Sequence, residues 1–293
     1  MRLDNERQSE NVEDRRFRRG MGVGSMQALY VLWPIFKLLL RTKFGWALIA
    51  VAVGAYLLGF NPLSLLQGPS GPPIQQTQDD SQAVFIKKVL ATTEDIWSQV
   101  LPQYGYRYVP PILVLYRGAT QSGCGFASAQ VGPFYCPVDQ KIYLDLEFFD
   151  KLAHRFNAPG DFAQAYVLAH EVGHHIQNIM GILEKVQALQ RQALRRGDKV
   201  RANRLQIPVE LQADCLAGVW GHYARKHLEP GDIEEALNAA SQIGDDTLQK
   251  RSQGYVVPDS FTHGTSEQRM KWFMRGFQSG DLRECNTFNS INL

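Results

Sequence analysis

The hydrophobic residues of the chain form one long run near the N-terminus and are spread periodically after it. Residues 44–60 contain no charged residue and are close to the length that crosses a bilayer as a helix. Residues 28–40 are also apolar but contain Pro34 and Lys37, so this stretch either extends the span or lies in the membrane interface. The pattern predicts a membrane segment over residues 28–60, with one transmembrane helix at about residues 44–60.

The residues that flank this segment predict its orientation. Residues 1–27 are charged and weakly apolar, which is typical of a disordered tail. Basic residues are frequent before the span, whereas the next one after Lys43 is Lys87, so the positive-inside rule places the tail in the cytoplasm. Residues 61–82 are rich in Pro, Gln, Ser and Gly and suit a flexible linker. The remainder of the chain is then expected outside the cytoplasm, in the periplasm or an equivalent compartment.

Two other interpretations of the apolar run compete with the membrane anchor. A cleaved signal peptide would begin earlier and would be followed by a small-x-small cleavage site, for which the sequence has no convincing candidate. A helix buried in a protein core rarely has an apolar residue or a glycine at every position, as this run does. The anchored interpretation is therefore favoured.

The periodic region, residues 83–293, predicts one folded domain with short strands before its main helices. Apolar positions at helical spacing indicate a helix over residues 83–101, and strands are expected at residues 112–116 and 141–146. This order of elements suggests an α+β domain with a small sheet.

Three further helices are expected in the second half of the domain. The first covers residues 161–180, with Asp161 and Gln164 as a capping box. The second opens at Pro208, because proline is favoured in the first turn of a helix. The third covers residues 232–250.

Charge and cysteine content narrow the choice of partners and compartment. The formal net charge of +2 argues against nucleic acid as the main partner, because a phosphate-binding surface needs a clear basic excess. An even number of cysteines in an exported domain favours two disulfides. Cys124 and Cys136 are close in sequence and are expected to close a short loop, which pairs Cys215 with Cys285 by elimination. Four buried free thiols would be expected only in a reducing compartment.

A five-residue motif carries the strongest chemical signal. His170 and His174 are four residues apart on a predicted helix, so both imidazoles project from one face and can hold one Zn²⁺. Glu171 lies beside the first ligand, where a carboxylate can take a proton from a water molecule that the metal has acidified. The apolar residues around the motif argue against a solvated surface helix.

A catalytic zinc takes a third protein ligand and keeps one position open. Glu210 and Asp214 are also four residues apart on a predicted helix, and apolar residues surround both. We assign Glu210 as the third ligand because its longer side chain reaches a metal shared with another helix. Asp214 would then accept a hydrogen bond from a ligand imidazole. The swapped assignment, with Asp214 on the metal, stays open.

The combined motifs resemble a known family. His170-Glu171-x-x-His174 together with Glu210-x-x-x-Asp214 is similar to the gluzincin arrangement of thermolysin-like peptidases. The whole layout resembles the bacterial putative neutral zinc metallopeptidase family, in one membrane span and in motifs at residues 11–16, 123–125, 132–137 and 259–264. The resemblance implies a zincin-like catalytic domain with active-site helices, one Zn²⁺ and peptidase activity. It also implies that His263 stabilises the oxyanion of the reaction.

These features predict a membrane-anchored zinc peptidase that acts on peptide or protein substrates, with the lipid bilayer as the partner of its N-terminal span. Two alternatives remain. One is a tethered binding or chaperone-like protein that keeps zinc for folding, although structural zinc sites usually have four protein ligands. The other is a zinc amidase that acts on cell-wall material, for which the chemistry of the site would be the same.

Overall fold

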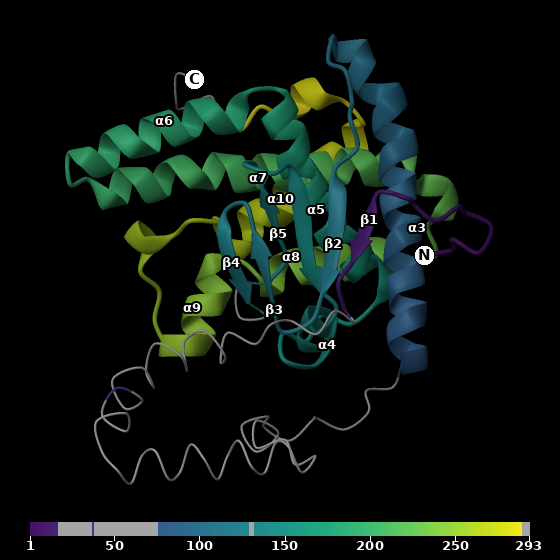
Figure 1. Cartoon of the computed structure of the whole chain (residues 1–293). Coiled ribbons are helices and arrows are strands. Elements are labelled where there is room, and N and C mark those ends of the chain that lie inside the picture. The colour runs from purple at the N-terminus through teal and green to yellow at the C-terminus, as the bar shows by residue number, and fades with distance from the viewer. Residues whose placement is uncertain (17–36, 38–75, 129–131, 289–293) are drawn as a thin grey trace, which may run out of the picture. The chain divides into compact units, whose positions relative to one another are not determined.

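The computed structural model describes residues 1–16, 37, 76–128 and 132–288 of the 293-residue chain (Figure 1). The chain divides into two units, of which one comprises Met1–Arg16 with Asp79–Leu293 and the other Phe17–Gln78. The fold described below is that of the first unit. No helix in the described part of the chain has both the length and the apolar character of a membrane span. The span predicted at residues 44–60 lies outside the described residues.

A four-stranded sheet forms one layer of the domain. Its strands, in the order β1-β2-β6-β5, are β1 (Val12–Asp14), β2 (Ile112–Tyr116), β6 (Lys141–Asp145) and β5 (Phe134–Cys136). The first three strands are parallel, and the edge strand β5 is antiparallel to β6. A separate hairpin is formed by β3 (Ala119–Ser122) and β4 (Gly125–Ser128). The predicted strands at residues 112–116 and 141–146 are confirmed, the second to within one residue.

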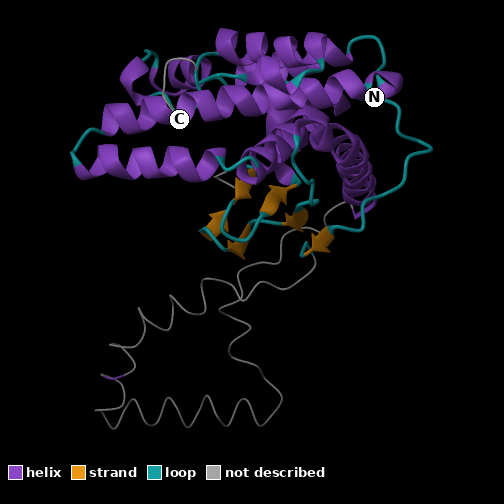
Figure 2. Cartoon of the chain, turned by 90° about the horizontal axis from the view of Figure 1, so that it is seen from above, coloured by secondary structure: helices purple, strands orange, loops and turns teal. Residues whose placement is uncertain are grey.

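Eight α-helices of the described residues gather on one side of these strands (Figure 2). They are α3 (Gln76–Val100), α4 (Glu147–His154), α5 (Asp161–Ile179), α6 (Ile182–Arg195), α7 (Lys199–Tyr223), α8 (Asp232–Gln242), α9 (Asp245–Gln253) and α10 (Ser266–Ser279). Short 3₁₀ helices lie between or after these α-helices: η2 (Leu101–Tyr104), η3 (Arg225–His227), η4 (Pro258–Ser260) and η5 (Leu282–Cys285). The expected α+β class is therefore confirmed.

The core lies between the sheet and α5. Leu113 and Leu115 of β2 belong to the same buried cluster as Tyr166 and Val172 of α5. Their neighbours in sequence face the other way, since side chains alternate along a strand, and Val114 belongs to a second, smaller cluster. Helix α5 is buried along most of its length, which removes the polar side chains on it from bulk water.

Residues 1–16 depart from the prediction of a disordered tail. They form β1, which pairs with β2 in the register Val12↔Leu113 to Asp14↔Leu115. Met1 and Leu3 are buried in the main core. A short, charged segment has no periodicity that announces a strand, and its order here comes from pairing with a strand about 100 residues later. The prediction is wrong for residues 1–16, and residues 17–27 lie outside the described part.

The helix boundaries also differ from the prediction in several places. Helix α3 begins at Gln76, inside the predicted linker. The expected capping box is absent from α5, because Asp161 instead pairs with the α-amino group of Met1 and Gln164 with Gln82. Pro208 lies inside α7 and does not open it, since the helix is already capped by Asp198.

The predicted helix over residues 232–250 is two helices. The chain breaks between α8 and α9 at Gly244, where an added Cβ atom would lie 2.4 Å from Oγ of Ser266. The close approach of α10 therefore bends the chain at this point, and a sequence pattern local to α8 and α9 carries no sign of it.

Helices α7 and α10 pack unusually closely, because glycines face each other across the contact. A Cβ atom on Gly276 would lie 1.9 Å from the carbonyl oxygen of Cys215, and one on Gly218 would lie 2.0 Å from that of Phe273. This approach lets short side chains of α7 reach side chains of α10, and the site described below uses it.

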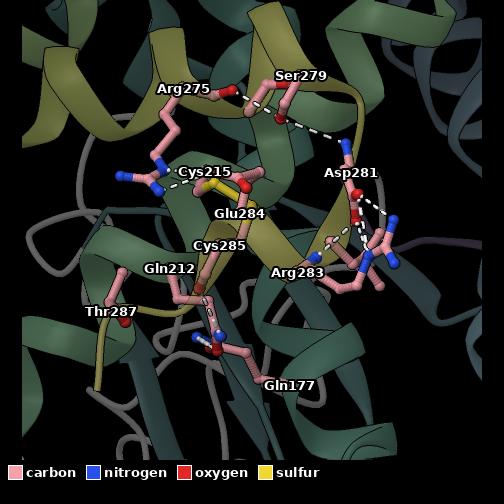
Figure 3. The surroundings of a disulfide bond; sticks show 12 residues. Gln177, Gln212, Cys215, Arg275, Ser279, Asp281, Arg283, Glu284, Cys285 and Thr287 are labelled. Atoms are coloured by element: carbon pink, nitrogen blue, oxygen red, sulfur yellow. Dashed lines mark hydrogen bonds and ion pairs between the residues drawn. A yellow bond between two sulfur atoms is a disulfide. The ribbon is translucent and has the colours of Figure 1, made fainter. Parts of the chain in front are cut away.

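Two disulfides close loops of very different length, with sequence separations of 12 and 70 residues. Cys124 bonds to Cys136, which ties β5 to the turn between β3 and β4, and Cys215 bonds to Cys285. Both pairings agree with the prediction. The second disulfide holds η5 against α7, and the carbonyl group of Cys285 accepts a hydrogen bond of 2.9 Å from Gln212 (Figure 3).

We predict that Gly276→Ala destabilises the domain, because the added methyl group must push α7 and α10 apart. Overpacking of this kind costs about 1–3 kcal/mol or more. Gly221→Ala on α7 is the matched control: its Cβ atom would lie 3.3 Å from the Phe277 ring and 3.8 Å from the Phe162 ring, and the gain in helix propensity offsets the closer contact. Chemical denaturation measures both variants, and equal stability of the two would contradict the close packing described here.

Candidate active site

The predicted zinc motif lies on the buried face of α5. His170, Glu171 and His174 line a cleft of about 650 Å³, and Glu210 of α7 lines it as well. His170 and Glu171 are each 7% exposed, and Glu210 is 6% exposed. Ligand atoms of His170, His174 and Glu210 all lie within 4.8 Å of one another. The structure thus brings together two imidazoles and a carboxylate that are 36 to 40 residues apart in sequence.

Asp214 lies behind the first imidazole. Its Oδ1 atom is 2.8 Å from Nδ1 of His170, whereas Nε2 of His170 is 3.2 Å from Oε2 of Glu210. An ionised carboxylate can only accept, so Nδ1 carries the proton and Nε2 faces Glu210 with its lone pair when the ring is neutral. Asp214 therefore occupies the position expected of a residue that orients a ligand, on the far side of the ring from Glu210.

The second imidazole is oriented by an amide. Nδ1 of His174 lies 2.9 Å from Oε1 of Gln177, and the amide nitrogen of Gln177 donates to the carbonyl of Val209 at 2.7 Å and to Gln212. Because the nitrogen of Gln177 is committed as a donor, its oxygen must accept, and the proton of His174 lies on Nδ1. Nε2 of His174 is then left facing Oε2 of Glu210 at 3.4 Å.

The two carboxylate oxygens of Glu210 have different partners. Its Oε2 atom faces both imidazoles, while Oε1 accepts a hydrogen bond of 2.7 Å from Gln206, one helical turn earlier on α7. Gln206 is itself held by Gln190 of α6 at 2.9 Å. The carboxylate is thereby fixed in orientation before any ligand binds.

A buried ion pair supports this arrangement from α10. Arg269 donates to both carboxylate oxygens of Asp214, from Nε at 2.8 Å and from Nη2 at 2.9 Å. Tyr166 of α5 donates to Oδ1 of Asp214 at 2.6 Å. Asp214 is fully buried and Arg269 is 3% exposed. Asp214 therefore receives hydrogen bonds from three side chains on two neighbouring helices, which satisfies its charge away from water.

These contacts shift the proton affinities of the site. Burial lowers the pKa of His170, but the carboxylates of Asp214 and Glu210 raise it more, to about 9. Burial raises the pKa of Glu210, but His174 and His170 hold it well below its usual range. Since a metal ligand must offer a lone pair, metal binding at the two imidazoles competes with their protonation.

His263 comes to the same cleft from the loop before α10. Its side chain is about half exposed, and Nδ1 lies 3.2 Å from Oδ1 of Asp245. The other oxygen of Asp245 accepts the backbone N–H groups of Thr262 and His263, both at 2.6 Å. Burial lowers the pKa of His263, but the hydrogen bond with Asp245 and the charge of Glu210 outweigh this, so the pKa is raised. The ring is therefore suited to donate.

The lining of the cleft is mixed in character. It includes Phe148 and Lys151 of α4, with Arg155 and Phe156 directly after that helix. Apolar and amide side chains come from α6 and α7 (Leu183, Val186, Gln187, Gln190 and Gln206). Gly132 to Tyr135, which lead into the edge strand β5, also line it. The edge strand β5 therefore borders the same cleft as the two histidines.

The donor set fits a catalytic zinc ion. Two imidazole nitrogens and one carboxylate oxygen make up the His₂Glu set that leaves a fourth position for water or substrate. His170 and Glu210 are buried, His174 is partly buried, and each donor is separately oriented, as required of zinc ligands in proteins. Asp161, Asp232 and Glu235 also lie close together, but Asp161 and Asp232 there bind the ammonium group of Met1.

Sequence reasoning missed three residues that complete the site. Tyr166, Gln177 and Asp245 belong to no motif. Their roles depend on tertiary contacts, with Asp214, His174 and His263 respectively. Arg269 pairs with Asp214. A buried tyrosine one turn before the first ligand histidine was the available signal for Tyr166.

We predict that Arg269→Met destabilises the protein by roughly 3–5 kcal/mol, because it leaves Asp214 buried without its cation. It should also weaken zinc binding, since Asp214 no longer holds His170 in place. Arg275→Met is the matched control on the same helix: Arg275 is half exposed and its pair with Glu284 contributes about 1 kcal/mol or less. Denaturation measures the stability and chelator competition the zinc affinity, and an unchanged zinc affinity of Arg269→Met would disprove the link between α10 and the candidate ligands.

Comparison with known proteins agrees with this geometry. Residues 1–288 match the family described as "putative neutral zinc metallopeptidase". The chain is 49% identical to the uncharacterized protein YpfJ of Escherichia coli strain K12 over 298 residues, which cover 98% of this chain and 99% of YpfJ. It is 40% identical to the uncharacterized protein Rv2575 of Mycobacterium tuberculosis strain H37Rv over 234 residues, 74% of this chain and 75% of Rv2575. No solved structure shows significant similarity to it. The chain therefore belongs to the putative neutral zinc metallopeptidase family.

Proposed function

We propose that this protein is a zinc-dependent peptidase that hydrolyses peptide bonds in extended substrates. The observation that carries the proposal is the convergence of His170, His174 and Glu210 in a cleft that Glu171 also lines. Glu171 makes no hydrogen bond to another described side chain, so its carboxylate remains available to a water molecule or a substrate. Family membership supports the same reaction class.

Each residue has a role that follows from its chemistry. A zinc ion bound by the three ligands would acidify a water molecule and polarise the substrate carbonyl. Glu171 takes one proton from the attacking water and then delivers it to the leaving amine nitrogen, so that the carboxylate is regenerated. His263, held by Asp245, donates a hydrogen bond to the oxyanion that develops on the substrate carbonyl oxygen. Asp214 and Gln177 keep the two imidazoles in the tautomer that offers Nε2.

We also propose that the domain works outside the cytoplasm, attached to a bilayer through the apolar segment within residues 28–60. Both disulfides support this compartment, because such bonds persist in oxidising surroundings, and the chain has no further cysteine. The uncharged run at residues 44–60 supports the attachment.

We predict that Glu171→Gln strongly slows hydrolysis but keeps zinc, because the amide cannot take the proton while the three candidate ligands remain. Loss of a general base lowers the rate by about 10²–10⁴-fold. The assay uses unstructured peptides and an unfolded exported protein, with bound zinc determined on the same samples. Glu184→Gln, at an exposed position of α6, is the matched control.

Lost hydrolysis with retained zinc in the Glu171→Gln variant supports the peptidase. Equal activity of the Glu171 and Glu184 variants would disprove the proposed base.

A separate assay of the unmodified protein tests the amidase. If this protein binds zinc, cleaves none of the peptides and releases amino groups from cell-wall material, the same site belongs to an amidase.

The edge strand β5 provides a surface for substrate backbone. It is bonded to β6 on one side only, and its residues line the cleft next to the histidines. A peptide that added to this edge would be held by backbone hydrogen bonds along the zinc ligands. The Cys124–Cys136 disulfide fixes the end of the strand.

Hydrogen exchange tests this docking. When the Glu171→Gln protein binds an intact peptide substrate, the outward amides of Phe134 to Cys136 should exchange more slowly. The amides of β1, at the opposite edge of the sheet, should keep their rates. Protection at β1 and none at β5 would rule out strand addition at this cleft.

A further inference from the structure

The first 16 residues are an integral part of the catalytic domain. The N–H group of Leu113 donates to the carbonyl of Asn11 at 2.9 Å, and that of Arg15 to the carbonyl of Leu115 at 2.7 Å. These bonds continue the ladder between β1 and β2 at both ends of their pairing. Removal of this segment would expose the buried strand β2 as a sheet edge.

The segment also neutralises a carboxylate that the domain has buried. Glu94 of α3 is 4% exposed. It accepts hydrogen bonds from Arg7 at 2.8 Å, Ser9 at 2.5 Å and Asn11 at 2.8 Å. All three partners come from the N-terminal segment. Without it, Glu94 would carry a buried charge with none of these partners, which is strongly unfavourable.

The basic residues within residues 1–16 have partners in the same unit. Arg2 pairs with Glu229, Arg7 with Glu94 and Asp95, Arg15 with Glu13, and Arg16 with Asp14. Lys141 of β6 also pairs with Glu13. Carboxylates of the unit balance the charges of these basic side chains. The basic side chains therefore do not require the N-terminus to stay in the cytoplasm.

The sequence between the two parts of the unit contains two uncharged runs. The first covers residues 20–36 and is strongly apolar from residue 28 onward, and the second covers residues 44–78 and is strongly apolar over residues 44–60. Both runs have the length of a short transmembrane helix, about 17 residues. The three charges that separate them are all basic: Lys37, Arg41 and Lys43. A cluster of this kind is retained on the cytoplasmic side of a membrane.

We infer that the chain crosses the membrane twice between residues 16 and 79, so that residues 1–16 share one side with the catalytic domain and residues 37–43 lie on the other. The inference rests on the membrane attachment proposed above and replaces the single span that the sequence pattern predicts. One crossing would separate β1 from β2 by a bilayer, and the observed pairing forbids this. Two crossings keep β1 in the sheet and still place the basic cluster in the cytoplasm.

Thiol labelling of the full-length protein tests the topology. All four native cysteines are in disulfides, so an introduced cysteine is the sole free thiol. Gln8→Cys reports on the N-terminal segment, Val138→Cys on the domain and Thr42→Cys on the basic cluster. Gln8 is exposed, and Val138 is 74% exposed. Asn5→Cys, also at an exposed position, replaces Gln8→Cys if that variant accumulates poorly.

The reagent is a membrane-impermeant maleimide applied to intact spheroplasts and to permeabilised ones. Positions 8 and 138 should be labelled to the same extent in intact spheroplasts, and position 42 only after permeabilisation. Labelling of 138 but not 8 in intact spheroplasts would overturn the inference in favour of one crossing. Labelling of all three without permeabilisation would instead show that residues 17–78 do not cross, which refutes the proposed attachment itself.

Discussion

The buried carboxylate of Asp214 is the interaction on which the candidate site depends. It lies on α7, accepts hydrogen bonds from Tyr166 and His170 of α5, and forms a two-point ion pair with Arg269 of α10. A charge in this position is tolerated only when all its partners are in place, because burial of an unpaired carboxylate is costly. The packing of these three helices therefore also sets the orientation of His170, the first candidate zinc ligand.

Close packing of the helices makes this network possible. The glycines Gly218 and Gly276 bring α7 and α10 near enough for backbone contact. The Cys215–Cys285 disulfide then ties the C-terminal turn η5 to the residue next to Asp214. On the other side of the metal ligands, Gln212 links Cys285 to Gln177, which orients His174. Both imidazoles are thus supported through α7.

The same physical rule explains why the N-terminus belongs to the domain. Glu94 is buried in α3 and receives its hydrogen bonds from residues 7–11, as Asp214 receives its own from α5 and α10. In both cases a carboxylate inside one helix is satisfied by segments far away in sequence. The domain is consequently assembled around paired charges, and the chain on either side of the apolar region contributes to one folded unit.

Features that depend on neighbouring residues could be predicted from the sequence alone. A spacing of four on a helix put His170 beside His174 and Glu210 on the face of Asp214, and strand patterns located β2 and β6 to within one residue. The tertiary structure decided which carboxylate faces the imidazoles, that Pro208 lies within α7, that α8 ends before Gly244 and that residues 12–14 form a strand. Each of these depends on a contact between segments distant in the chain, and no local periodicity records such a contact.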